Sequence, residues 1–174
     1  ESRNDIGNAK RLIRRFGIDL LWVKDLGWHV WSGKHWNRER GERAAQQRAH
    51  DVARLILDEA AAAEAAGPTR DKDGELLELP GDFTKRIQAL RAWSNASGNM
   101  RHVTGMLSAA APDLACDRAE LDADPLLFNL ENGTLVLSPD GSAALRPHSR
   151  RDRINMVAPV TYDPGAGCPK FEEW

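Results

Sequence analysis

Two stretches in the first half of the chain repeat apolar residues at the spacing of an amphipathic helix. The first predicts a helix that Asp5 caps and Gly17 ends, with its apolar face at Ile6, Ala9, Leu12, Ile13 and Phe16. The second predicts a long helix from about Glu42 to Ala66, ended by Gly67-Pro68, with its apolar face at Ala45, Ala49, Val52, Ile56, Ala60 and Ala63. Most of this second face is alanine, which suits close helix packing.

Short runs rich in aromatic and β-branched residues lie between these two helices and indicate strands. Three strands are predicted, at Leu20 to Val23, Trp28 to Trp31 and Lys34 to Trp36. The pair Ser32-Gly33 favours a tight two-residue hairpin between the last two. Four of the six tryptophans fall in this region: Trp22, Trp28, Trp31 and Trp36.

The helical pattern resumes at Phe83, after an acidic loop over residues 67–82, and continues to about Ala110. The run Ser94 to Gly98 is expected to break it into two helices. Past Pro112 the pattern is that of short strands. Strands at Leu126 to Leu130 and Thr134 to Leu137 are predicted to form a hairpin with Asn132-Gly133 as its turn. A second turn at Asp140-Gly141 can lead into a third strand around Ala144 to Arg146. Residues 156–160 predict a strand or an extended arm.

These elements predict an α+β fold with a helical middle and two small antiparallel β pieces. We expect residues 1–174 to form a single accessory domain. Its expected parts are a helix plus a Trp-rich β hairpin (1–41), a helical part (42–110) and a β-rich C-terminal part (111–174).

Composition excludes several classes of protein. With 174 residues, 41% of them hydrophobic, the chain can bury about 70% of its unfolded surface. Cys116 and Cys168 are far apart and no His stands near them at ligand spacing, so neither a disulfide framework nor a zinc site is indicated. No apolar stretch approaches the ~18 residues of a membrane span. We expect a cytoplasmic protein without a membrane partner.

The net charge of −2 hides a segregation of charge along the chain. Residues 1–56 carry +5, residues 57–82 carry −6 and residues 83–110 carry +4. Two basic blocks separated by an acidic loop could form one positive face that attracts phosphate. The alternative, ordinary solvated helix faces, stays open at this point.

The Trp-rich hairpin and the basic blocks together give candidate nucleic-acid-binding residues. Single-strand binders combine aromatic stacking surfaces with cations that follow the phosphate backbone. The candidates are Trp31, Lys34, Trp36, Arg38, Arg40, Arg43, Lys85, Arg86, Arg91 and Arg101. The tryptophans have an alternative role as core anchors.

The sequence contains no complete motif for catalysis or metal binding. The nearest approach to a phosphate loop, Gly27 to His35, has five residues between its glycines and a His where Ser or Thr is needed. Asp122 and Asp124 could in principle hold a metal, but their position just before Pro125 favours a turn or cap. We predict no catalytic residue, metal site or cofactor in this chain, and neither ATP hydrolysis nor primer synthesis.

Several sequence phrases follow one another in order along almost the whole chain. They are Gly7-Asn-Ala9 with Arg11-Leu12, Gly27-Trp28-x-Val-Trp31-x-Gly-Lys-x-Trp36, Leu121-Asp-x-Asp-Pro125-Leu-Leu-Phe-Asn129 leading into Asn132-Gly133-Thr134, Arg146-Pro-His148 and Ala158-Pro-Val-x-Tyr162-Asp-Pro164-x-Ala166-x-Cys168-Pro169. In this order they resemble the domain that precedes the superfamily-3 helicase in phage and plasmid DNA primases, also present in poxvirus-type primase-helicases. The turn Ser138-Pro-Asp-Gly141 departs from the family pattern without touching function.

The resemblance implies a piece of a longer replication protein, with a primase module before it and a hexameric helicase after it. ATP and Mg²⁺ would belong to that downstream helicase, and no catalytic residue is carried over to this chain. A non-catalytic accessory or collar domain is implied, which couples primase to helicase and contacts single-stranded or forked DNA. Its expected partners are DNA, its own primase and helicase domains, and further copies of the full-length protein. The alternative is a structural oligomerisation or spacer domain without DNA binding.

Overall fold

A computed structural model describes residues 1–167, which divide into two compact units. Unit 1 comprises Glu1–Val30 with Glu39–Cys116. Unit 2 comprises Trp31–Arg38 with the described residues from Asp117 onward. The helices and two small sheets confirm the predicted α+β class. The Trp31–Arg38 segment therefore folds with the C-terminal third of the chain, and the predicted single-domain organisation stays a prediction.

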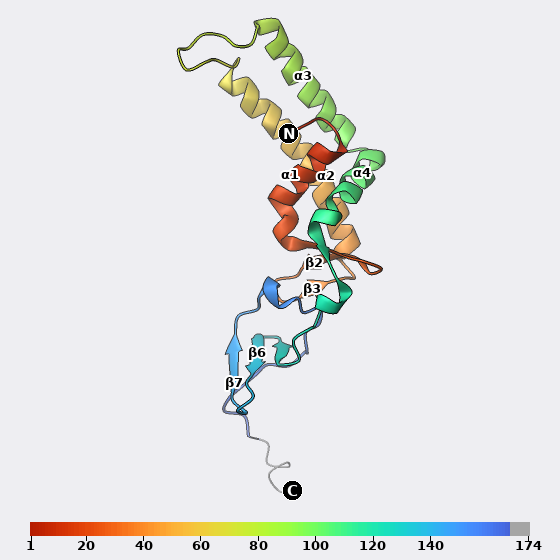
Figure 1. Cartoon of the computed structure of the whole chain (residues 1–174), viewed down its shortest axis with the longest axis vertical. Helices are drawn as coiled ribbons and strands as arrows, with labels where there is room; N and C mark the ends of the chain where they lie inside the picture. Colours follow the sequence, from red (N-terminus) through yellow and green to blue (C-terminus); the bar gives the residue numbers. More distant parts are fainter. Residues whose placement is uncertain (168–174) are drawn as a thin grey trace. The chain divides into compact units, whose positions relative to one another are not determined.

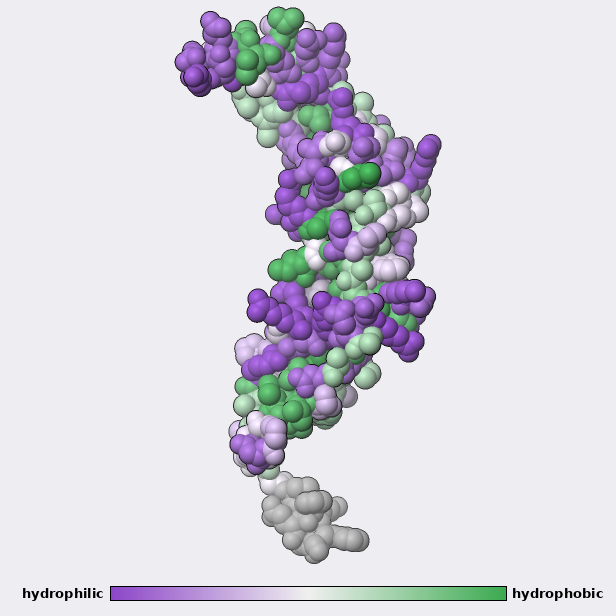
Figure 2. Space-filling model, in the orientation of Figure 1, coloured by the Kyte–Doolittle hydropathy of each residue, from purple (hydrophilic) through white to green (hydrophobic). Residues whose placement is uncertain are grey.

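Unit 1 is built on four α-helices: α1 (Asp5–Phe16), α2 (Gly41–Ala66), α3 (Pro80–Ser97) and α4 (Met100–Ala110). Figure 1 shows α2 and α3 side by side, joined by the loop 67–79, and α1 packs mainly against α4. The loop is largely hydrophilic in Figure 2, as its acidic composition predicts.

The predicted small-residue face of α2 lies at the centre of the unit 1 core. Five of its residues are 0% exposed: Ala45, Ala49, Val52, Ile56 and Ala60. They meet Ala9 and Leu12 of α1 and the buried face of α4 at Val103, Met106, Leu107 and Ala110. The prediction of this face is confirmed, because short side chains let neighbouring helix axes approach closely.

The N-cap predicted for α1 is displaced by one residue. Asn4 is the cap, since its Oδ1 accepts a hydrogen bond from the Gly7 N–H at 2.8 Å. The Asp5 carboxylate instead lies 2.7 Å from Nδ1 of His102, which ties α1 to α4. At the other end, α1 stops at Phe16 with Gly17 as its C-cap residue, as predicted, and the chain continues into a short 3-10 helix, η1 (Gly17–Asp19).

The predicted helix break at Ser94 to Gly98 is also displaced. α3 runs through Ser97, and α4 begins at Met100. Ser94 Oγ donates to the Ala53 carbonyl at 2.7 Å, and Ser97 Oγ accepts from the Asn8 side-chain amide at 2.9 Å. Because distant partners satisfy both hydroxyls, these serines do not compete for the backbone of their own helix.

Three strands of unit 1 lie in the order β2-β1-β4: β1 (Leu20–Val23), β2 (Gly27–Trp31) and β4 (Ala115–Cys116). β1 and β2 are antiparallel, with Trp22 opposite Trp28, and the last residue of β2, Trp31, is counted with unit 2. β1 and β4 pair in parallel. The prediction of purely antiparallel β pieces missed this pair, because β4 follows a short 3-10 turn, η2 (Pro112–Leu114), and carries no hairpin signal.

Unit 2 contains a three-stranded antiparallel sheet of β5 (Leu127–Leu130), β6 (Gly133–Leu137) and β7 (Ala143–Arg146). It also holds the short strand β3 (Trp36–Asn37) and the 3-10 turns η3 (Arg118–Glu120) and η4 (Arg150–Asp152). Residues 156–160 form the expected extended arm along β5. The Ala158 N–H donates to the Asn129 carbonyl, and the Glu131 N–H donates to the Val160 carbonyl, both at 2.9 Å.

Two of the predicted hairpin turns, Asn132-Gly133 and Ser32-Gly33, are shifted along the chain. Leu130 is opposite Gly133, so the turn residues are Glu131 and Asn132 rather than Asn132-Gly133. The Asn132 side chain pins the arm, accepting from the Tyr162 N–H at 3.0 Å and donating to the Tyr162 carbonyl at 2.9 Å.

In the Trp-rich region, the Ser32 N–H donates to the His35 carbonyl at 2.9 Å. Gly33, at φ +97°, and Lys34 are therefore the central turn residues, in place of the predicted Ser32-Gly33. The third strand accordingly begins at Trp36 instead of Lys34.

Gly133 is required by a close approach of two strands. A Cβ at this position would lie 2.5 Å from the carbonyl oxygen of Arg146 on β7. We expect Gly133→Val to lower the free energy of unfolding by about 2 kcal/mol, because β6 would have to move away from β7. Urea unfolding beside the parent chain measures the loss, with Ala143→Val at an exposed strand position as control. Equal stability of Gly133→Val and the parent would contradict the close β6–β7 approach.

Candidate nucleic-acid interface

The ten predicted nucleic-acid-binding residues are divided between the two units. Unit 2 holds Trp31, Lys34, Trp36 and Arg38, and unit 1 holds Arg40, Arg43, Lys85, Arg86, Arg91 and Arg101.

The segment Trp31–Arg38 is fixed to the rest of unit 2 by hydrogen bonds to its backbone and to one indole. The Lys34 carbonyl accepts from the Asn129 side-chain amide at 3.0 Å. The Trp36 N–H donates to the Ile154 carbonyl at 2.8 Å, and its indole Nε1–H donates to the Arg150 carbonyl at 2.9 Å. The segment is thus held against residues 150–154 by bonds that do not involve its basic side chains.

Asn129 is the polar centre of unit 2. Its amide nitrogen also donates to the Met156 carbonyl at 3.0 Å, and its oxygen accepts from the Thr134 hydroxyl at 3.0 Å. Nδ1 of His148 lies 2.7 Å from the same oxygen and donates to it. One buried amide therefore joins the Trp31–Arg38 segment to β6, to the arm and to the start of the basic stretch after β7.

The two tryptophans of the segment have different environments. Trp36 is only 5% exposed, so its ring is a core anchor and offers no face to a base. Trp31 is half-buried, meets Trp36 edge to face at 5.7 Å between ring centroids, and has the Arg150 guanidinium 5.3 Å from its own centroid. The aromatic contribution expected of this segment is therefore reduced to Trp31.

Lys34 is paired within unit 2. Its ammonium forms an ion pair with the Glu131 carboxylate, and both side chains are nearly half exposed. The hydrogen bond from Lys34 holds the pKa of Glu131 below its usual value, and the charges of Lys34, His148 and His35 lower it further. A phosphate at Lys34 would have to compete with this carboxylate.

A basic stretch that the sequence prediction missed lies beside the same segment. In η4, the Ser149 side chain accepts from the Arg151 N–H at 3.2 Å and caps the turn. Arg150 and Arg151 are exposed, and Arg151 forms no ion pair with another described residue. The run Arg150-Arg151-Asp-Arg153 is visible in the sequence. A charge count misses it because the acidic residues within 146–174 lower the net charge of that stretch to +1.

The flanking arginines of this stretch are engaged in structural pairs. Arg146 binds Asp152 through both terminal nitrogens, at 2.8 and 2.7 Å, and this bond raises the pKa of Arg146. Arg153 pairs with Glu120 at 2.9 Å. We define the η4 patch as the side chains of Trp31, Lys34, Arg150 and Arg151.

In unit 1, the predicted basic residues of α3 are all paired with carboxylates. Lys85 lies 3.3 Å from Asp82 and Arg91 lies 2.6 Å from Glu64. Arg86 binds Glu78 through two nitrogens, at 2.8 and 3.0 Å, and lowers the pKa of Glu78. Arg91 thus joins α3 to α2 and Arg86 joins α3 to the loop, whereas the Lys85 pair lies within α3.

The other basic residues of unit 1 stand at helix starts. Arg40 is the N-cap residue of α2, while Arg43 and Arg101 are exposed in the first turns of α2 and α4 and form no ion pair with another described residue. Glu64, the partner of Arg91, follows Arg43 by 21 residues, so the two ends of α2 are separated by about 30 Å. The basic residues of α3 and those at the helix starts do not form one cluster.

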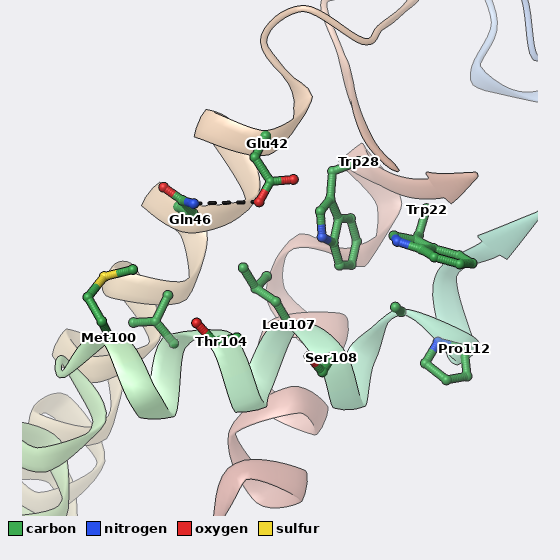
Figure 3. A pocket seen from close by; sticks show the side chains of 11 residues that line it. Trp22, Trp28, Glu42, Gln46, Met100, Thr104, Leu107, Ser108 and Pro112 are labelled. Carbon is green, nitrogen blue, oxygen red and sulfur yellow. Dashed lines mark hydrogen bonds between the residues drawn. The ribbon is translucent and has the colours of Figure 1, made fainter. Parts of the chain in front are cut away.

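A cavity of about 580 Å³ opens between the start of α2, one side of α4 and the β1–β2 pair. Figure 3 shows the rings of Trp22 and Trp28 at one end and Met100 at the other, with Leu107 between them. Its polar groups are Glu42, Gln46, Thr104 and Ser108. The Gln46 amide points at the Glu42 carboxylate over a long 3.5 Å contact. No sequence signal predicted this cavity.

The sequence of residues 9–174 matches the family model described as D5 N terminal like. The chain belongs to the D5 N-terminal-like family. Domains of this family occur in phage and viral primase-helicase proteins, which confirms the resemblance carried by the ordered sequence phrases. No curated protein matches the chain.

Membership of the D5 N-terminal-like family supports a role in replication, and the family is not itself a catalytic domain family. Within residues 1–167, no three His, Cys, Asp or Glu side chains converge as a metal site would require. The Asp124 carboxylate accepts from the Leu126 N–H at 2.9 Å, as expected of a turn residue. The Asp122 carboxylate instead accepts from the Asn155 N–H, 33 residues later, at 2.9 Å. No helix of the described part is long and apolar enough to cross a membrane.

Proposed function

We propose that this D5 N-terminal-like chain is a non-catalytic accessory or collar module of DNA replication that contacts single-stranded DNA through the η4 patch. In the full-length protein it would lie between primase and helicase domains and take part in assembly of the helicase ring. ATP and Mg²⁺ would be bound by the helicase domain.

The observation that carries this proposal is the arrangement of Trp31 and Arg150. An indole with a guanidinium 5.3 Å from its centroid, next to exposed Arg151, provides both elements of a single-strand contact. Bases of any sequence can stack on aromatic rings, and arginines can pair with the phosphates between them. Backbone hydrogen bonds hold this site in shape. The exposed Arg151 guanidinium can then reach a phosphate without displacing a carboxylate of the described residues.

We expect weak, sequence-independent binding whose affinity falls as salt rises. If three phosphates are engaged, the logarithm of the affinity should fall with a slope of about −2 against the logarithm of salt concentration. The double reversal Arg150→Glu/Arg151→Glu should weaken binding of all oligonucleotides at least about tenfold and lower this slope. Fluorescence anisotropy of a labelled oligonucleotide, titrated at several salt concentrations, measures both quantities.

The matched control reverses the charge of two residues that form ion pairs with carboxylates of the chain. Lys85→Glu/Arg91→Glu changes the net charge by the same amount but should leave the salt slope unchanged. Equal weakening by the two double variants would show an unlocalised charge effect and contradict an interface at η4.

The alternative function, a structural spacer without DNA binding, has one observation in its favour. Four of the ten predicted contact residues, Lys34, Lys85, Arg86 and Arg91, form ion pairs with carboxylates of the chain. Absence of oligonucleotide binding at low salt would support the spacer and overturn the proposal of a DNA contact.

A further inference from the structure

The cavity of unit 1 has an aromatic floor set by strand register. Trp22 and Trp28 are directly opposite each other on antiparallel strands, so their indoles leave the sheet on the same face. Trp28 is 6% exposed and is a core ring, like Trp36, so it supports the cavity from behind. Trp22 packs against the same core but is only half-buried, and it is therefore the ring that a ligand in the cavity can reach. Figure 3 shows both rings at the same end of the cavity, facing the α4 side chains. Aromatic side chains presented by a small sheet are a common stacking surface for bases.

The polar residues of the cavity favour a neutral heterocycle over an anion. Its lining contains one carboxylate, Glu42, and no lysine or arginine. The long Gln46–Glu42 contact leaves the second carboxylate oxygen and the amide oxygen able to accept hydrogen bonds. Thr104 and Ser108 add exposed hydroxyls on α4. Amino and imino N–H groups of a base match these acceptors, as carboxylates match the cytosine amino group elsewhere.

We propose that this cavity receives one base of a single-stranded nucleic acid. The inference rests on the proposed DNA contact and adds a second, base-binding site in unit 1. The volume of about 580 Å³ lies in the range of small-molecule sites and accommodates a nucleoside. The phosphates on either side of the inserted base remain outside, where Arg43 and Arg101 follow the lining residues Glu42 and Met100 in the sequence.

A peptide side chain is the competing occupant. A helix docking in a groove needs several apolar contacts repeated at helical spacing. Here the two indoles lie at one end of the cavity and Met100 at the other, and polar side chains are interspersed along its length. The cavity therefore fits a flat ring with a hydrogen-bonding edge better than a row of aliphatic side chains.

The test compares intact and abasic oligonucleotides on the whole chain. The parent should bind an oligonucleotide carrying abasic sites about tenfold more weakly than the intact one of equal length, since one stacked base typically accounts for that much affinity. In Ser108→Phe, a ring placed at an exposed position of α4 fills the cavity, and this preference should shrink to about twofold. Gln88→Phe, at an exposed α3 position away from the cavity, should keep the parent preference.

Trp31 of the η4 patch also stacks bases in the proposed function, so the parent's preference for intact over abasic oligonucleotides does not by itself locate the base. The change that Ser108→Phe causes in this preference decides whether the cavity binds it. An unchanged abasic preference in Ser108→Phe, with binding otherwise intact, overturns the cavity proposal while the DNA contact at η4 stands. A loss of the preference in both phenylalanine variants overturns it as well, because the effect is then not local to the cavity. Absence of binding by the parent overturns both proposals. Competition by an apolar peptide with no change in abasic preference assigns the cavity to a protein partner.

Discussion

Replacing Glu59 by Ala should lower the free energy of unfolding by about 3 kcal/mol. Its partner, Arg11, is only 2% exposed and lies between α1 and α2. Nε and Nη2 of Arg11 donate to the two Glu59 oxygens at 2.9 and 2.7 Å. Removal of the carboxylate leaves a buried guanidinium without its counter-charge, which commonly costs about 3–5 kcal/mol. The lower end applies because the Glu59 side chain is 35% exposed.

The same helix offers a matched control for this substitution. Glu64 also pairs with an arginine, Arg91, but both side chains are half exposed. Glu64→Ala should therefore change stability by no more than about 0.5–1 kcal/mol. Urea unfolding of the parent and both variants, followed by tryptophan fluorescence, measures the difference. Equal losses for the two variants would contradict the buried character of the Arg11–Glu59 pair.

The Glu59 pair also gives a pH dependence with a definite sign. The hydrogen bond from Arg11 lowers the pKa of Glu59 below its ordinary value of 4.5. A carboxyl whose pKa is lower in the folded chain stabilises that chain above about pH 4.5, and the contribution disappears as pH falls through the folded value. The stability difference between the parent and Glu59→Ala should accordingly be constant near neutral pH and shrink in acid.

The local elements of the fold could largely be predicted from the sequence because each has a signal within a few residues. The alanine-rich face of α2 recurs with helical period, and Gly67 ends the helix at φ +77° as predicted. The turn at Asp140-Gly141 is likewise local: the Gly141 N–H donates to the Ser138 carbonyl, and Gly141 has φ +85°. Side-chain period and turn chemistry suffice in these cases.

The predictions that are wrong depend on partners distant in the chain. From the sequence alone, Ser94 is predicted to break a helix. In the structure its hydroxyl donates a hydrogen bond to the Ala53 carbonyl, 41 residues earlier, and the helix continues. Asn132 is predicted to begin its turn with positive φ, but it is the second turn residue, has no positive φ, and its amide binds the backbone of Tyr162, 30 residues later. No local pattern contains such partners, so propensity alone places these boundaries incorrectly.

The candidate interface could be predicted only in part for a related reason. A charge count finds Lys85, Arg86 and Arg91 but not the carboxylates that they bind. It also averages Arg150 and Arg151 with neighbouring acids and so misses them. Trp31 and Trp36 look equivalent in the sequence, whereas only Trp36 has its indole bonded to the Arg150 carbonyl and buried. Three-dimensional pairing decides which cations and rings a ligand can reach.

Gly41→Ala should lower the free energy of unfolding by about 3 kcal/mol as well, for a steric reason. Gly41 opens α2 against β2, and a Cβ there would lie 1.8 Å from the Trp28 carbonyl oxygen and 2.8 Å from the His29 Cα. Both contacts are backbone, so the first turn of α2 would have to move away from the sheet, and packing against Trp28 would be lost.

Gly81→Ala is the control for Gly41→Ala, because Gly81 also lies in the first turn of a helix and a Cβ there meets nothing within 4 Å. This control should be neutral or slightly stabilising, since alanine is the better helix former. Urea unfolding measures both variants, and near-ultraviolet circular dichroism reports the packing of the tryptophans. A Gly41→Ala chain as stable as Gly81→Ala would mean that α2 does not begin against β2, and the cavity between them would lose its described shape.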